Sequence, residues 1–439
     1  MSQWQPTGAL SRACTIGALA LVGGLAVGRP LLVAVAVPFL IHTALALLLR
    51  PRSGAAHPAP EAWSELGQLT LDEGQATTST LHVDPGRAGA GPIELVVRTI
   101  GRTAHVATDP PTGTSQTLHP QDVTDPAPLT VGATRWGRIR LAEEKVALYT
   151  GWAGFAWGPT SLGQQTLTVL PRRSRTDAST PAPHPIGLVG AHRSRRPGSG
   201  IELAGIRPFA VGDRLRRIHW PSTQRTGALQ TIVSDAEEDA SILLLVDGLA
   251  DHGTSGGLTG AQTSLDITMR AAATIAEHHL HLGDRVGLRV IGGGGAIVPS
   301  AAGRAHVDRI LGVLARVRPA AMARADEARL ALRVPPGTVV VVLTPLLEQR
   351  PADLAVLAAR ARHDVVVVDT MPVNADPVLE ETTTKAVGAL AWRLRRLDRE
   401  PVRAGLQAQG CAVVAWQGPQ TLGRVLREIA RNRSRMVGR

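Results

Sequence analysis

The sequence predicts an α/β domain with a doubly wound parallel sheet, preceded by a small antiparallel β-sandwich and an N-terminal transmembrane helical hairpin. Three observations support this fold class. Two long uncharged segments stand near the N-terminus, a region of short alternating segments follows, and apolar runs alternate with helix-like stretches in the C-terminal half. At 439 residues the chain is too long for one core, so two or three domains are expected.

Residues 1–52 are predicted to form two transmembrane helices. Ala13–Gly28 carries no charge, and Pro30–Leu49 has His42 as its one markedly polar interruption. Twenty helical residues at ~1.5 Å each cover the ~30 Å hydrocarbon core. A break at Arg29-Pro30 places both ends of the hairpin on one side. Arg12, Arg50 and Arg52 flank the two predicted helices on the outside, whereas Arg29 alone lies between them. Because positive residues favour the cytoplasmic side, the rest of the chain is expected in the cytoplasm, anchored at the cell membrane. A signal peptide with Ala13–Val27 as its apolar region is the alternative.

Residues 63–172 show the pattern of a β-sandwich. Short alternating segments are separated by turns rich in Gly, Pro and Asp, which is typical of antiparallel strands. The predicted strands are Ser79–Val83, Ile93–Thr99, Leu129–Gly132, Trp136–Leu141, Lys145–Tyr149 and Thr166–Val169. Residues 173–199, rich in Arg, Ser, Pro and His, are expected to form a flexible linker to the last domain.

Residues 200–435 contain the signature segment described below and the predicted α/β domain. Its apolar runs are Ile242–Val246, Val286–Ile291, Val339–Leu343, Val365–Val368 and Ala412–Ala415. The helix-like stretches are Thr263–Leu282, Arg304–Val317, Ala323–Arg333, Ala352–Arg362, Ala386–Leu397 and Gln420–Asn432. Strands that are apolar throughout and alternate with helices indicate a parallel sheet covered on both faces. In such a sheet, a ligand-binding or active site is expected at the carboxyl ends of the strands.

Composition excludes several function classes. A formal charge of +11 permits attraction to nucleic acid or anionic lipid. The arginines are spread along the chain and aromatic residues make up 3%, so no nucleic-acid partner is predicted. The two cysteines, Cys14 and Cys411, offer neither a disulfide framework nor a zinc pattern. Gly292–Gly295 lacks the lysine of a phosphate-binding loop and is interpreted as a turn after a strand.

The segment Gly205–Arg225, GIRPFAVGDRLRRIHWPSTQR, is unusually rich in arginine. Its signature residues are Arg207, Gly212, Asp213, Arg217, Trp220 and Arg225. The Gly-Asp pair is a turn signal, the aspartate can accept paired bonds from a nearby arginine, and the tryptophan offers a face for a guanidinium group. Two interpretations remain open: an internal clamp over the α/β domain, or a docking surface for an acidic partner.

The spacing Gly-Ile-Arg-Pro-Phe-x-x-Gly-Asp-x-x-Arg-x-Ile-x-Trp-x-x-[Ser/Thr]-x-Arg resembles the signature of the domain-of-unknown-function 58 family. With the preceding strands and the two apolar spans, the resemblance covers nearly the whole chain. Members of the family have a von Willebrand A-like domain and tend to be encoded beside MoxR-type AAA+ ATPases. His219 stands where the family usually has Asp, and Gln224 where it usually has Ala.

Von Willebrand A domains end their first strand on Asp-x-Ser-x-Ser, whose oxygens help to hold a divalent ion. Here Leu249 and Asp251 replace both serines after Asp247, and Thr344 follows the third predicted strand where an acidic ligand would be expected. Leu249 has no lone pair to offer a hard cation. We therefore expect a degenerate site at Asp247, Asp251 and Thr344, with no metal bound and with Asp247 bracing its loop.

The resemblance implies a non-enzymatic, membrane-anchored bacterial scaffold or adaptor in envelope or complex assembly. Its expected partner is a protein, a MoxR-type AAA+ ATPase. No catalytic residue, cofactor or small-molecule substrate is expected. One alternative is a component of a cell-wall or peptide-processing enzyme, for which Cys411 is the one thiol outside the apolar spans. The other is a metal-dependent adhesion-type binding domain, which would need Asp247.

Overall fold

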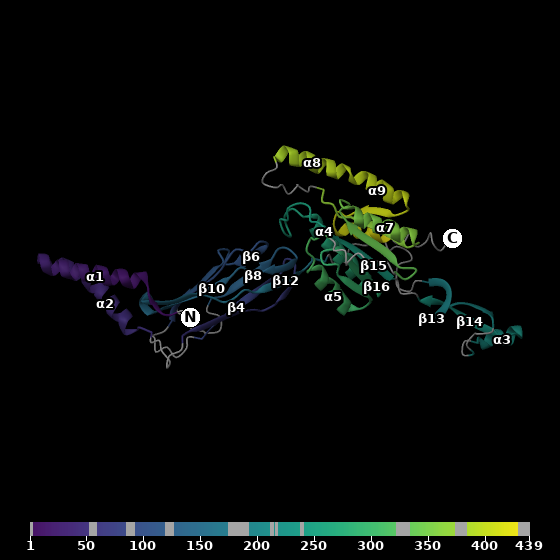
Figure 1. Cartoon of the computed structure of the whole chain (residues 1–439). Coiled ribbons are helices and arrows are strands. Elements are labelled where there is room, and N and C mark those ends of the chain that lie inside the picture. The colour runs from purple at the N-terminus through teal and green to yellow at the C-terminus, as the bar shows by residue number, and fades with distance from the viewer. Residues whose placement is uncertain are drawn as a thin grey trace. The chain divides into compact units, whose positions relative to one another are not determined.

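A computed structural model of the chain describes residues 3–51, 59–84, 93–118, 127–173, 193–210, 215, 218–237, 241–321, 334–373 and 384–428. The chain divides into two compact units, Met1–Leu170 and Pro171–Arg439 (Figure 1).

The first unit begins with a helical hairpin made of α1 (Gly8–Val27) and α2 (Pro30–Leu48). Gly28 ends α1 in the left-handed conformation at φ 60°, and Pro30 opens α2 at its first position, as expected for these residue types. The predicted break at Arg29-Pro30 is therefore confirmed. At Gly24 a Cβ atom would lie 2.9 Å from Val33, so the helices approach closely there. Both helices are long and apolar enough to cross a membrane.

Twelve described strands and one 3₁₀ turn, η1 (Gly151–Ala153), make up the rest of this unit. The strands are β1 (Gln5–Pro6), β2 (Glu61–Leu66), β3 (Thr70–Asp72), β4 (Ala76–Asp84), β5 (Ile93–Ile100), β6 (Val106–Asp109), β7 (Thr114–Leu118), β8 (Leu129–Ala133), β9 (Gly137–Arg140), β10 (Glu144–Thr150), β11 (Phe155–Ser161) and β12 (Thr166–Leu170). They form sheets in the orders β1-β11-β10-β5-β7, β2-β4-β8-β6 and β3-β12-β9.

Every segment predicted as a strand in this region overlaps a strand of the structure. The purely antiparallel pairing was wrong in one place, because β3 runs parallel to β12. The parallel neighbours share one core: Leu71 of β3 is buried in the same cluster as Leu167 and Val169 of β12. Alternate residues of both strands thus face inward, which is the general condition for a half-buried strand.

One buried ion pair lies inside this core. Arg98 of β5 has no exposed surface and donates through Nε to a carboxylate oxygen of Glu144, at the start of β10. Its Nη1 donates to the carbonyl oxygens of Ser79 at 2.6 Å and Ala127 at 3.0 Å, and its Nη2 donates to Ser79 Oγ at 2.5 Å. Ser64 donates to the second oxygen of Glu144 at 2.8 Å. Both charges are therefore hydrogen-bonded, which a buried pair requires.

The helical hairpin is fastened to the sandwich. β1, just before α1, pairs with β11, and Thr7 N donates to Gly154 O at 3.0 Å. Leu10 of α1 and Phe155 of β11 are buried together with Ala46 of α2. At Gly154 a Cβ atom would lie 2.7 Å from that of Ala46, so only glycine permits this approach.

The second unit is built on a six-stranded sheet in the order β17-β16-β15-β18-β19-β20. The strands are β15 (Ser241–Gly248), β16 (Arg285–Gly292), β17 (Ile297–Ala301), β18 (Val339–Thr344), β19 (Asp364–Asp369) and β20 (Ala412–Ala415). All neighbours run parallel except β17, an edge strand antiparallel to β16. The five predicted strands are confirmed. β17 was missed, and Gly292–Gly295 forms the turn that leads into it, with all four glycines at positive φ.

The helices of this unit are α4 (Ser264–His281), α5 (Arg304–Leu314), α7 (Gln349–Arg360), α8 (Lys385–Leu397) and α9 (Arg399–Ala408). Leu243 and Leu245 of β15 share a core cluster with α7 and α9. Because side chains alternate along a strand, Leu244 and Val246 face the other side, and α4 contacts β15, β16 and β18. Both faces of the sheet are therefore covered.

Two predicted helices fall partly or wholly outside the described residues. The stretch Ala323–Arg333 is one of them. Gln420–Asn432 is described to residue 428, as the 3₁₀ turn η3 (Pro419–Thr421) followed by helix over 422–428. α9 was not predicted.

Before the sheet, β13 (Arg193–Pro208) and β14 (Gln230–Glu237) form a two-stranded antiparallel ribbon with α3 (Trp220–Thr226) between them (Figure 1). β13 begins inside the stretch 173–199 that was predicted as a flexible linker. Residues 193–199, the last part of that stretch, therefore belong to a strand. Backbone pairing with β14 makes these residues a strand, and the register sets residue 193 opposite residue 237.

Candidate functional site

The carboxyl ends of β15 and β18 meet at the point where the strand order reverses direction. In open α/β sheets this switch point is where ligands bind. Asp247 is the next-to-last residue of β15 and is 2% exposed, and Thr344 is the last residue of β18 and is fully buried. Thr344 Oγ1 donates to Asp247 Oδ2 at 2.7 Å, and Leu249 N donates to Oδ1 at 3.1 Å. Both carboxylate oxygens of Asp247 thus accept bonds from the protein itself.

Burial changes the acidity of Asp247. Desolvation raises the pKa of its carboxyl to about 6, against the opposing effect of the two donated hydrogen bonds. A carboxyl shifted in this direction holds its proton more readily than an exposed one. Asp247 therefore accepts one hydrogen bond from the loop after β15 and another from the end of β18.

Asp251, the third residue of the predicted degenerate site, points elsewhere. Its Oδ1 accepts from Leu265 N, in the first turn of α4, at 3.1 Å. The structure therefore brings Asp247 and Thr344 together but directs Asp251 to a helix start. Among the described residues, no group of three His, Cys, Asp or Glu side chains is placed to hold a metal ion.

A second carboxylate, which the sequence did not single out, lies one strand further along. Asp369 ends β19 in register with Thr344. Arg399 of α9 donates to its Oδ1, and Arg399 Nε donates to Pro345 O at 2.8 Å. Burial raises the pKa of Asp369, while Arg399 opposes the shift. The position after the run Val365–Val368 was a usable signal for the aspartate, but nothing in the sequence marked its partner.

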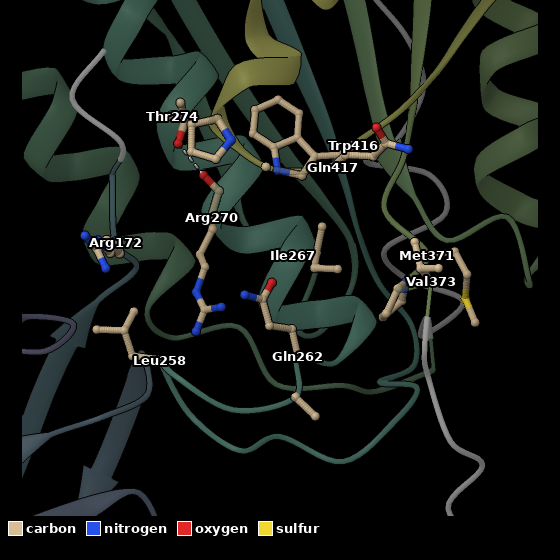
Figure 2. Close-up of a pocket in the computed structure, with 14 residues that line it drawn as sticks. Arg172, Leu258, Gln262, Ile267, Arg270, Thr274, Met371, Val373, Trp416 and Gln417 are labelled. Carbon is tan, nitrogen blue, oxygen red and sulfur yellow. Dashed lines mark hydrogen bonds between the residues drawn. The ribbon is translucent and has the colours of Figure 1, made fainter. Parts of the chain in front are cut away.

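A pocket of about 850 Å³ opens beside these ends of the sheet (Figure 2). Its walls come from α4, the loop before α4, and the segments that follow β19 and β20. The lining residues are Arg172, Leu258, Ala261, Gln262, Ile267, Arg270, Thr274, Met371, Pro372, Val373, Trp416, Gln417, Gly418 and Pro419. Within this described lining two side chains are cationic and none is acidic. In Figure 2 Arg270 projects from α4 toward the loop of Leu258, and its Nη2 lies 3.5 Å from Gly257 O.

The signature segment is described in part. Gly212, Asp213 and Arg217 lie outside the described residues, so the predicted aspartate–arginine contact stays a prediction. Arg207 donates to Pro208 O at 3.0 Å, and Arg225 is exposed in the last turn of α3.

Trp220 is 61% exposed, whereas Ile218 is buried and bridges to Thr231 of β14. Ile218 is therefore the residue of this pair that packs inward, and the indole ring of Trp220 lies largely in solvent.

His219 has a local structural role. Its Nδ1 accepts from Ser222 N at 3.3 Å and so caps the start of α3. Aspartate, which the family usually has here, is among the best N-cap residues for the same reason. With histidine in place of aspartate at position 219, the N-cap of α3 is therefore kept, with a ring nitrogen as the acceptor instead of a carboxylate oxygen.

The fold and this site define an α/β protein with a parallel sheet, joined to a sandwich and two apolar helices. Residues 205–380 match the family described as "Protein of unknown function DUF58". This match includes the signature segment, whose spacing resembles that family.

Two relatives are the "Uncharacterized protein Mb1516" of Mycobacterium bovis and the "Uncharacterized protein Rv1480" of Mycobacterium tuberculosis. Each is 29% identical to this chain over 196 residues, which cover 42% of this chain and 59% of the relative. The match thus spans less than two thirds of the length of these relatives. The PilB minor pilin from Streptococcus sanguinis aligns over 77% of this chain and 86% of its own, at 11% identity and a TM-score of 0.28. That likeness is too low to support an argument about fold or function.

Proposed function

We propose that this chain is a non-enzymatic, membrane-anchored scaffold, and that its second unit is a von Willebrand A-like, doubly wound domain that binds a protein partner. The strand order supports this class: the first strand of the sheet, β15, lies centrally, and the edge strand β17 is antiparallel. The helices α1 and α2 supply the anchor, with the body in the cytoplasm.

One observation supports binding rather than catalysis. At the switch point, where chemistry or metal binding would be expected, both oxygens of Asp247 accept protein hydrogen bonds, one of them from Thr344. Two of the lone pairs of Asp247 are thus used inside the protein, and among the described residues no group of three His, Cys, Asp or Glu side chains stands ready to complete a metal site. The same edge instead presents a pocket lined by two arginines together with apolar side chains.

The partner that fits this pocket is a protein segment rich in acidic residues. Arg172 and Arg270 can bind carboxylates, Gln262 and Gln417 can pair with peptide groups, and Trp416 offers an apolar surface. The family resemblance makes a MoxR-type AAA+ ATPase the candidate. An ATPase of this kind acts where ATP is available, which agrees with a cytoplasmic body.

Capture from solubilised membranes tests the proposal. The full chain should recover a hexameric ATPase in an ATP-dependent manner, and Arg270→Glu should reduce the recovery by at least tenfold. Arg309→Glu, an exposed position on α5, is the control with the same charge change and should bind as the wild type does. Equal recovery by both variants, each shown to be folded by its unfolding temperature, would exclude the pocket. Failure of the wild type to recover any ATPase would exclude the partner.

Protease treatment of intact cells tests the sidedness. A cytoplasmic body stays protected until the membrane is permeabilised. Digestion of the body in intact cells would contradict the proposed topology.

A further inference from the structure

Helix α8 presents a continuous apolar stripe to solvent. Its members are Val387, Leu390, Leu394 and Leu397, which are 61%, 60%, 54% and 58% exposed. The spacing of three, four and three residues places all four on one face of the helix. Single exposed aliphatic residues are ordinary, but four aligned on one face mark a surface that binds something.

The opposite face of α8 is fixed to the domain. Trp392 stands two positions from both Leu390 and Leu394, which on a helix is about 160° away from each. Its ring packs on His252, with 5.8 Å between the centroids. Arg395 Nη2 donates to Glu348 Oε1 at 2.7 Å, and Gly388 is buried. The stripe therefore faces outward because the other side of the helix makes the contacts.

α9 holds the far end of α8 in place. The two helices are separated by the single residue Asp398, which keeps a helical backbone (Figure 1). Arg399 is bonded to Asp369 and Leu406 is buried in the core of the sheet. The stripe is thus formed before any partner arrives and needs no folding on binding.

The charges of α8 indicate what kind of surface the apolar stripe binds. Arg393 is exposed beside the stripe, three positions from Leu390, and Lys385 and Arg396 are exposed further round the helix. Arg395 is bonded to Glu348, and no acidic residue occurs within the helix. A basic helix with an aliphatic face is the type that lies in the headgroup region of an anionic membrane. The long side chain of Arg393 can reach the phosphates while the aliphatic residues enter the acyl boundary, and Lys385 and Arg396 add positive charge near an anionic surface.

We infer that α8 docks on the surface of an anionic bilayer, with its apolar stripe in the lipid and its basic residues at the headgroups. The inference rests on the membrane anchoring proposed for α1 and α2, which keeps the second unit near a bilayer. Docking of α8 would be a second membrane contact, besides the permanent insertion of α1 and α2. This second contact is reversible and depends on lipid charge and salt.

Spin labels on the full chain, one copy per nanodisc, test this directly. In a background with Cys14→Ser and Cys411→Ala, labels are placed at Leu394→Cys on the stripe and at Ala389→Cys on an exposed side of the same helix. The nanodiscs contain either phosphatidylcholine alone or phosphatidylcholine with one quarter phosphatidylglycerol. Collisions with oxygen report lipid, and collisions with a water-soluble nickel chelate report solvent.

In the anionic discs the label at 394 should lose at least threefold of its nickel accessibility and gain oxygen accessibility. The label at 389 should remain accessible to water in both discs, and 0.5 M salt should reverse part of the protection at 394. Equal solvent accessibility at both positions in the anionic discs would overturn the inference. So would protection at 394 that appears only when a soluble protein partner is added, or only with several copies per disc.

A third label separates this result from the anchoring itself. Ile16→Cys lies on α1 and is 44% exposed in the isolated chain. Oxygen accessibility at 16 in every disc shows that the hairpin is inserted. An inserted hairpin with a solvated stripe refutes α8 docking alone, whereas a solvated label at 16 refutes the anchor on which it rests.

Discussion

Replacing Asp247 by Asn tests whether this residue is a neutral brace or a charged ligand. The carboxyl is buried between Thr344 Oγ1 and Leu249 N, which donate to its two oxygens. An asparagine can keep both contacts, because its oxygen accepts from Leu249 and its amide nitrogen can donate to the Thr344 hydroxyl. The substitution therefore removes the titration, and it changes the Thr344 hydroxyl, which also accepts from Leu346 N, from a donor to an acceptor toward residue 247.

The magnitude follows from the pKa of Asp247, which burial raises from 3.8 to about 6. The folded state then holds a proton that the unfolded state has lost, so stability falls as the pH rises from about 4 to about 6. A shift of this size corresponds to ~3 kcal/mol at pH 8. Asp247→Asn avoids that loss, so it should stabilise the second unit at pH 8 and leave it nearly unchanged at pH 4.

Thermal unfolding of the full chain in detergent, recorded from pH 4 to pH 8, measures the effect. At ~2–4 °C per kcal/mol for a domain of this size, the variant should unfold at least 5 °C higher at pH 8. The difference in unfolding temperature between variant and wild type is compared at each pH. The titration of other groups, such as Asp369, contributes equally to both proteins and cancels in that difference. Asp247→Ala, which loses both hydrogen bonds, is the control and should be less stable than the Asn variant at every pH.

Two results would refute this account of Asp247. One is a loss of stability in Asp247→Asn at pH 8, because it would mean that the folded state needs the charge. The other is stabilisation of the wild type, and not of the variant, by millimolar Mg²⁺ or Mn²⁺. That outcome would support the metal-dependent alternative instead.

Three further predictions concern other parts of the chain. Arg98→Ala leaves Glu144 buried without its charged partner and should cost ~3–5 kcal/mol in the unfolding of the sandwich, measured by denaturant titration. Cys411 is 3% exposed and burial raises the pKa of its thiol, so a thiol reagent should label it far more slowly in the folded than in the unfolded protein; rapid native labelling would favour the enzyme alternative. Trp220→Ala should change stability by less than ~0.5 kcal/mol because the ring is exposed, whereas Ile218→Ala should cost ~2–4 kcal/mol, a contrast that thermal unfolding can resolve.

The strands of the parallel sheet were predictable because burial on both faces requires an unbroken apolar run. Val339–Leu343 is such a run, and each of its residues is fully buried in β18. β17 escaped because Ile297–Ala301 lies at an edge, is largely exposed and contains Pro299. α9 escaped for a similar reason: most of Arg399–Ala408 faces solvent, and its buried Arg399 does not fit an apolar pattern.

The candidate site was predictable only where a residue's position in the chain determines its position in the fold. Asp247 and Thr344 follow apolar runs directly, and strand ends in a parallel sheet meet at one edge. The partner of Asp369 is set by the path of the chain through α8 and α9, thirty residues away in sequence. The pocket depends likewise on segments after β19 and β20 that have no pattern of their own. Pairings made across the fold leave no periodic signal.

The contacts between hairpin and sandwich bear on how the first unit is anchored. A signal peptide is dispensable to the mature fold, but β1 lies before α1 and forms the edge strand beside β11. Cleavage after α1 would remove that strand, and it would also remove Leu10 from the cluster that buries Phe155. His42 Nε2, six residues before the end of α2, lies 2.8 Å from Trp152 O in η1. Since both helices contribute to the packing of the sandwich, the interactions favour retention of the hairpin as part of the folded protein, with the sandwich held directly against it.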